Sequence, residues 1–178
     1  MVAEVDDQVL VRAAKGGDLD AFEVLLRRHQ TPVYRVALRM LGSEADAQDA
    51  SQEAFVQAWK SLGGFRADSS FATWMYRIVT NRCLNVIATH RQDQPLPDRL
   101  AALAGDPADA AESRARLDAL LEAIQALPDE QRAAIVLREL QGLTYEETAE
   151  VLAVSLAAVK GRLHRARLTL VERMAGWQ

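Results

Sequence analysis

Apolar positions recur along this chain in steps of three and four residues, and no segment shows the alternation of a half-buried strand. In the first half, this pattern and its breaks predict four helices, over about Asp7–Ala14, Asp18–Met40, Ser43–Leu62 and from residue 70 to His90. Asp and Ser at the starts and Gly at the ends are typical helix-capping residues. The N-terminal half is therefore expected to be a small four-helix domain.

The second half starts near Ala110 and shows the same helical pattern. Thr144 to Glu147 forms a capping box, which opens a short helix ending near Ala153. After a tight turn, a final helix is predicted to run to about Met174. Two helices joined in this way are typical of a helix-turn-helix, whose second helix presents its outer face to the major groove of DNA.

Residues 92–112 separate these halves and contain three of the five prolines, five acidic residues and one basic residue. We interpret them as a linker between domains spanning residues 1–91 and 113–178. The alternative is a long surface loop within one domain, which is uncommon at this length. The predicted fold class is all-α, with two small helical domains joined by an acidic linker.

Composition narrows the function without identifying it. The 178 residues contain no apolar run long enough to span a membrane, and the acidic first residues do not form a secretory signal. The single cysteine, Cys83, and three scattered histidines argue against disulfides and His/Cys metal clusters, so we predict no metal and no cofactor. The single cysteine indicates a reducing compartment, so we predict a cytoplasmic protein. The sequence has no phosphate-binding glycine loop and no nucleophile beside a base, so we predict that the protein is not an enzyme.

The net charge of −4 opposes nucleic-acid binding until its distribution is considered. Residues 1–91 contain eleven basic and eleven acidic residues, and the linker carries much of the negative charge. The last helix, in contrast, holds five basic residues and one acidic residue, namely Lys160, Arg162, Arg165, Arg167, Arg173 and Glu172. This local charge favours DNA binding, although a solvated basic face is the alternative.

The helix over residues 43–62 carries an acidic stripe of Asp46, Asp49 and Glu53 beside a stripe that contains Phe55 and Trp59. Together these stripes can dock a basic protein helix. Periodicity alone favours the other interpretation, a solvated face above an ordinary core stripe.

The helix that ends near His90 has two distinct faces. Met75, Val79, Cys83 and Val86 are expected to be buried, which makes Cys83 an inert core thiol. The opposite stripe consists of Trp74, Arg77, Asn81 and Asn85, residue types suited to stacking on and hydrogen bonding to unpaired bases. The alternative places Trp74 in the core.

Three segments in order resemble the bacterial sigma factors of the extracytoplasmic-function (ECF) group. DAQDASQEAFVQAWKSL (46–62) is similar to the helix that binds core RNA polymerase, and FRADSSFATWMYRIVTNRCLN (65–85) to the part that binds the minus-ten promoter element. LRELQGLTYEETAEVLAVSLAAVKGRLHRARLTL (137–170) resembles the part that binds the minus-thirty-five element. The resemblance covers about residues 9–91 and 117–174.

The resemblance implies a sigma factor that directs core polymerase to promoters, binding the minus-thirty-five element as duplex and the minus-ten element as melted strand. The polymerase-binding residues would be Asp46, Asp49, Gln52, Glu53, Phe55 and Trp59. The minus-ten residues would be Phe65, Arg66, Ser69, Phe71, Trp74, Arg77, Asn81 and Asn85. The minus-thirty-five residues would be Arg138, Thr144, Lys160, Gly161, Arg162, His164 and Arg165.

The expected partners are thus core RNA polymerase, promoter DNA as duplex and single strand, and an anti-sigma factor, which this family often has. Four residues depart from the family's usual helix-turn-helix pattern: Ala153, Ala157, Ala158 and Gly161 stand where Gly, Gly, Thr and Ser are common. Two other functions stay open at this point. One is a dimeric helix-turn-helix regulator that binds DNA without polymerase, and the other is a helical interaction protein without promoter selectivity.

Overall fold

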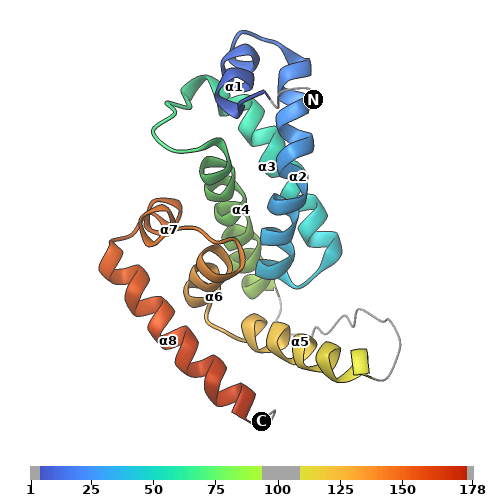
Figure 1. The fold of residues 1–178 in the computed structure, drawn as a ribbon, viewed down its shortest axis with the longest axis vertical. Helices are drawn as coiled ribbons and strands as arrows, with labels where there is room; N and C mark the ends of the chain where they lie inside the picture. The colour runs from blue at the N-terminus through green and yellow to red at the C-terminus, as the bar shows by residue number, and fades with distance from the viewer. Residues whose placement is uncertain (1–4, 94–108, 176–178) are drawn as a thin grey trace.

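The computed structural model describes residues 5–93 and 109–175, which are helical throughout apart from the connecting turns and contain no strand. The first half consists of α1 (Asp7–Lys15), α2 (Leu19–Leu41), α3 (Glu44–Ser61), a 3₁₀ turn η1 (Leu62–Gly64) and α4 (Phe71–Asp93) (Figure 1). The second half consists of α5 (Asp109–Gln125), α6 (Asp129–Ile135), a π-helical turn η2 (Val136–Leu140), α7 (Tyr145–Leu152) and α8 (Leu156–Met174). The predicted all-α fold is confirmed.

The predicted caps form as hydrogen bonds. The Asp18 carboxylate accepts from the amide of Ala21 at the start of α2, and the Thr144 hydroxyl accepts from that of Glu147, whose side chain accepts in return from the Thr144 amide. Gly42 ends α2 in the left-handed conformation, with a φ of 69°. These local interactions explain why the helix ends fall near their predicted positions.

In the N-terminal domain, α2 contacts α1, α3 and α4, and α3 also contacts α4. The core face of α3 is built from small residues, since Ala47, Ala50, Ala54 and Ala58 are all buried. Their steps of three and four place them on one side of the helix, where small side chains allow neighbouring helices to approach closely. The opposite side of α3 is left for solvent or a partner.

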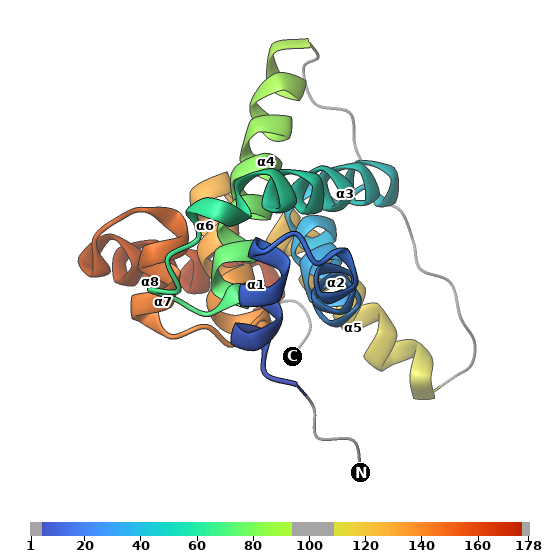
Figure 2. The ribbon, with the colours of Figure 1, turned by 90° about the horizontal axis from the view of Figure 1, so that it is seen from above.

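The two domains pack directly against each other. In Figures 1 and 2, α7 lies beside α4, and α6 lies between α8 and the N-terminal helices. Arg132 of α6 is buried in this contact and donates to the carbonyl of Met40 in α2. Tyr76 of α4 donates to the side chain of Gln141, and one apolar cluster runs through both domains. The described halves therefore share a core.

The predicted linker over residues 92–112 lies largely outside the described residues, so its boundaries stay a prediction. At its edges, α4 continues to Asp93 and α5 begins at Asp109. Across residues 5–93 and 109–175, no helix is long and apolar enough to cross a bilayer.

Candidate functional site

A groove of about 790 Å³ runs between α2 and α3. Its apolar wall is formed by Phe22, Leu26, Tyr34, Phe55, Val56 and Trp59, and Gln52 also lines it. Three of the six predicted polymerase-binding residues, Gln52, Phe55 and Trp59, therefore lie in one groove. Sequence analysis missed the α2 side, because only packing shows which face of α2 lies opposite α3. The sequence holds one signal of the groove on the α3 side: the apolar residue Val56 lies one helical turn after the polar residue Gln52. In the structure, Val56 is 53% exposed and lines the groove.

The acidic stripe lies beside this groove rather than in it. Asp49 is exposed, whereas Glu53 forms an ion pair with Arg82 of α4. Glu53 thus also joins α3 to α4. The stripe leaves negative charge next to an apolar groove, which suits a partner helix with both apolar and basic side chains.

The two faces of α4 are separated as predicted. Met75, Val79 and Cys83 are fully buried, and Val86 is half-buried. Burial raises the pKa of the Cys83 thiol to about 12, which keeps it protonated and unreactive. Arg77, Asn81 and Asn85 are exposed along the other face.

An aromatic cluster lies under the loop of residues 65–70. The rings of Phe65 and Trp74 are 4.9 Å apart, and that of Phe71 is 5.8 Å from Trp74. Phe65 and Phe71, which were predicted to contact DNA, are 6% and 3% exposed and support the loop from beneath. Trp74 is half-buried, so it is intermediate between its two predicted positions, the outward face of the helix and the core. Of the loop's other predicted residues, Arg66 is exposed and Ser69 is half-exposed.

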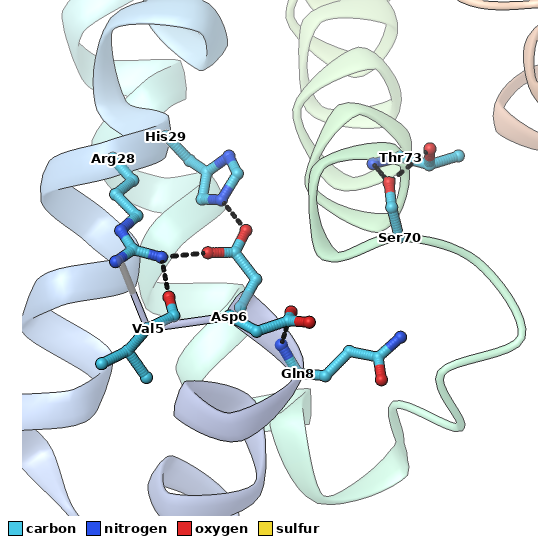
Figure 3. A network of polar contacts seen from close by, with 8 residues as sticks. Val5, Asp6, Gln8, Arg28, His29, Ser70 and Thr73 are labelled. Carbon is cyan, nitrogen blue, oxygen red and sulfur yellow. Dashed lines mark hydrogen bonds and ion pairs between the residues drawn. The ribbon is translucent and has the colours of Figure 1, made fainter. Parts of the chain in front are cut away.

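A polar network joins α1 to α2 close to this loop (Figure 3). Arg28 and His29 of α2 point toward the start of α1, where both bind the carboxylate of Asp7, at 2.9 and 2.5 Å. His29 lies within α2 with its side chain 14% exposed, and its partner Asp7 is 22 residues away in the chain. The ring of His29 also lies 5.1 Å from that of Phe71.

The outer face of α8 is basic, with Lys160, His164 and Arg165 exposed. Thr144 is exposed at the start of α7, and Gly161 is half-buried within α8. The guanidinium of Arg138 lies 5.0 Å from the centre of the Tyr145 ring, and the Lys160 ammonium lies 6.0 Å from it.

Tyr145 was missed by the sequence analysis. The hydrogen bond from Arg167 and the positive charges around the ring lower the pKa of Tyr145. Only the tertiary structure brings these cations to one ring, so no signal in the local sequence could have identified it.

Arg162, which was predicted to belong to the minus-thirty-five surface, is paired with an acidic residue of α6. Its guanidinium lies 3.0 Å from the carboxylate of Glu130 in α6, and its side chain is 15% exposed. Arg162 thus holds α8 against α6 and does not lie on the open basic face. Arg167 is exposed but pairs with Glu139. The basic residues of α8 are therefore offset by more than Glu172 of the same helix, because Glu130 of α6 and Glu139 of η2 also pair with them.

Comparisons with known proteins agree with this geometry. Residues 25–92 match the family Sigma-70 region 2, and residues 117–170 match Sigma-70, region 4. The chain is 36% identical to the RNA polymerase sigma-H factor of Pseudomonas aeruginosa and 35% identical to the ECF RNA polymerase sigma-E factor of Escherichia coli K12. Each alignment covers 94% of this chain and 93% of the relative.

Solved structures show the same arrangement of helices. CnrH, in complex with the cytosolic domain of CnrY, superposes with a TM-score of 0.73 at 28% identity, over 96% of this chain and 97% of CnrH. The sigma factor RpoE of Bartonella quintana, in complex with the anti-sigma factor NepR, gives a TM-score of 0.74 at 22% identity, over 88% of this chain and 98% of RpoE, and supports the fold alone. With the family matches and the relatives at 35–36% identity, these results show that the chain belongs to the ECF sigma factors of bacterial RNA polymerase.

Proposed function

We propose that this sigma factor binds core polymerase through the α2–α3 groove, the melted minus-ten strand through the exposed face of α4, and the minus-thirty-five duplex through α8. The observation that carries the proposal is the α4 face. Arg77, Asn81 and Asn85 stay exposed while the opposite face is fully buried. These side chains hydrogen bond and stack without needing a duplex groove, which suits unpaired bases. The chain itself would perform no catalytic step.

For the duplex contact, the proposal rests on Lys160, His164 and Arg165 of α8, together with Thr144 at the start of α7 and Arg138 of η2. Their side chains would neutralise phosphates or contact base edges of the major groove. Arg162 is left out of this surface because it pairs with Glu130.

The first test is run-off transcription from a library of random promoters, using core polymerase with and without the chain. Chain-dependent transcripts that share two elements at a fixed spacing would support the proposal. Duplex binding without any gain in initiation would instead favour a helix-turn-helix regulator.

Two valine variants test whether the polymerase contact lies in the groove. Val56→Asp places a charge on its apolar wall and should weaken core binding at least about tenfold, since an apolar contact would lose its burial. Val9→Asp is the matched control, because Val9 is 52% exposed on α1, outside the groove. Equal core affinity for both variants would place the polymerase contact elsewhere.

The DNA contacts are tested with holoenzyme. Asn81→Ala should weaken binding to single-stranded promoter DNA, whereas Thr89→Ala, further along α4, should not. Lys160→Ala should weaken duplex binding and reduce its salt slope by about one, as loss of one phosphate contact does. Arg173→Ala, in the last turn of α8, is the charge-matched control.

An anti-sigma factor is proposed as the second protein partner. The support is the family membership and the similarity to CnrH, which was solved with the cytosolic domain of CnrY. Such a partner would compete with core polymerase for the chain. The test is capture of the chain from cell extract with and without excess core: a captured protein that core displaces supports the proposal, and the absence of any such competitor contradicts it.

A further inference from the structure

Both ends of the loop of residues 65–70 are linked to α1, one directly and the other through His29 of α2. At the start, the Phe65 carbonyl accepts a hydrogen bond from the ammonium of Lys15, the last residue of α1. At the end, Phe71 begins α4 and packs against the ring of His29. His29 donates from Nε2 to Asp7, which lies in the first turn of α1. The two ends of α1 are therefore linked to the two ends of the loop, directly through Lys15 and indirectly through Asp7 and His29 of α2.

Between these anchors the loop has a conformation that it would not keep by itself. Ala67 has a φ of 58°, in the left-handed region that residues with a Cβ avoid. The Ser70 hydroxyl accepts from the amide of Thr73 at 3.0 Å and so caps α4 (Figure 3). Contacts outside the loop must hold Ala67 in place, and its flanks are contacted by Lys15 of α1, His29 of α2 and Trp74 of α4.

We infer that α1 is the positioning element of the minus-ten surface, and that Lys15, Asp7 and His29 are positioning residues of this sigma factor. None of them would touch DNA. Lys15 holds the carbonyl of Phe65, and the Asp7–His29 pair holds Phe71, so that Arg66 and Ser69 are presented beside Trp74. The inference rests on the proposed binding of melted minus-ten DNA by this face. A loop held in its bound conformation loses less entropy when the strand binds.

The alternative for Lys15 is a direct phosphate contact, and the geometry argues against it. Its ammonium is hydrogen bonded to the Phe65 carbonyl. A lysine that contacts phosphate contributes to the salt slope of binding, whereas a lysine that binds a carbonyl does not. The two roles therefore separate in one measurement.

The test uses holoenzyme reconstituted with each variant, with core affinity and melting temperature measured first. The probes are a single-stranded DNA of about twelve nucleotides, selected from a random pool with the unmodified holoenzyme, and a duplex carrying the minus-thirty-five element. Lys15→Met and Asp7→Ala should each weaken single-strand binding about tenfold and reduce discrimination against substituted bases. Duplex binding should stay within about twofold of the unmodified value, and the salt slope for the single strand should not change.

The chain offers matched controls. Lys60→Met removes an exposed lysine from the last turn of α3, and Asp20→Ala removes an acidic residue from the first turn of α2. Both should leave single-strand binding near its unmodified value. Lys15→Arg, which keeps a donor, should restore most of the loss.

A variant of His29 separates the effect of the Asp7–His29 hydrogen bond from the effect of the ring contact between His29 and Phe71. His29→Phe keeps a ring against Phe71 but removes the hydrogen bond to Asp7, so it should behave like Asp7→Ala. The double variant should then be no worse than Asp7→Ala, because Asp7→Ala already removes the hydrogen bond to His29 together with the ion pair to Arg28. Amide hydrogen exchange of residues 66–70 should be faster in Asp7→Ala, in His29→Phe and in the double variant than in the unmodified protein.

Unchanged single-strand affinity and discrimination in Lys15→Met and Asp7→Ala would overturn the inference, as would a salt slope that falls by about one for Lys15→Met. Failure of the proposed function looks different: the unmodified holoenzyme would then select no single-stranded sequence at all. That result would remove both proposals, whereas a variant that binds normally removes only the positioning role of α1.

Discussion

The guanidinium of Arg132 donates a hydrogen bond of 2.6 Å to the backbone carbonyl of Met40, which precedes it by 92 residues. Met40 lies in the last turn of α2, where carbonyls have no partner within the helix. Arg132 also donates to the carbonyls of Gln125 and Leu127 in its own domain. Burial lowers the pKa of Arg132, and the Asp129 carboxylate opposes this shift. One side chain thus caps α2 and joins the two domains.

Removing this side chain should be costly. Arg132→Met leaves three buried carbonyls without their donor, and we expect a loss of about 3 kcal/mol in the free energy of unfolding. Urea denaturation measures it. Arg91→Met is the control, because the Arg91 side chain is 63% exposed in its ion pair with Asp129 and should contribute at most about 1 kcal/mol. Similar small losses for both variants would mean that the domain contact contributes little stability.

The contact between α4 and α7 predicts that the domains separate during initiation. Tyr76 and Gln141 are joined by a hydrogen bond of 3.4 Å, whereas elements centred at minus-ten and minus-thirty-five are about 85 Å apart along DNA, at 3.4 Å per base pair. A short bis-maleimide bridge between Tyr76→Cys and Gln141→Cys should therefore abolish transcription from promoters that need both elements. Buried Cys83 should not react with the reagent.

The control is the same double variant without the bridge, which should transcribe normally. Full activity of the bridged chain would show that both elements are bound without separation of α4 from α7.

Gly161 lies within the continuous helix α8. A Cβ at this position would meet only the end of the Arg165 side chain, at 3.5 Å, which is an ordinary contact. Gly161→Ala should therefore raise the free energy of unfolding by up to about 1 kcal/mol. Gly42→Ala is the opposing control: its φ is +69° and its Cβ would lie 2.9 Å from Gln125, so it should destabilise the protein. A loss of stability in Gly161→Ala would contradict this account of α8.

Ala153 ends α7 with a φ of 52°, a conformation that favours glycine. Ala153→Gly should therefore stabilise the helix-turn-helix by about 1 kcal/mol. Thermal unfolding would detect this as a rise of a few degrees in Tm. An unchanged or lower Tm would mean that the Ala153 side chain contributes as much as its strain costs.

The Cys83 thiol should behave as a core group. Because burial raises its pKa from 9.0 to about 12, it should resist iodoacetamide at pH 8 in the folded protein and react once urea unfolds it. Between pH 9 and 12 the unfolded chain loses this proton before the folded chain does. Stability should therefore fall as pH rises through that window, by about 1 kcal/mol per pH unit from this group. Cys83→Ala should lose stability less steeply, and an equal slope would refute the assignment.

Local sequence patterns predicted the helices of this protein and the sides of them that face the core. Met75, Val79 and Cys83 were predicted to be buried because their spacing places them on one face of α4, and they are. The capping box at Thr144 was predicted equally well. Helix periodicity and caps act within about four residues, so these features are visible in a short stretch of sequence.

Which side chains remain available to a partner depends on how the helices pack against one another. Arg162 was assigned to a DNA surface, but it pairs with Glu130. Phe65 and Phe71 were assigned to the minus-ten surface and are buried, with Phe71 against the ring of His29, and the groove beside α3 owes half of its wall to α2. Burial and ion pairing depend on side chains that arrive from distant elements, and no local pattern encodes which of them will meet.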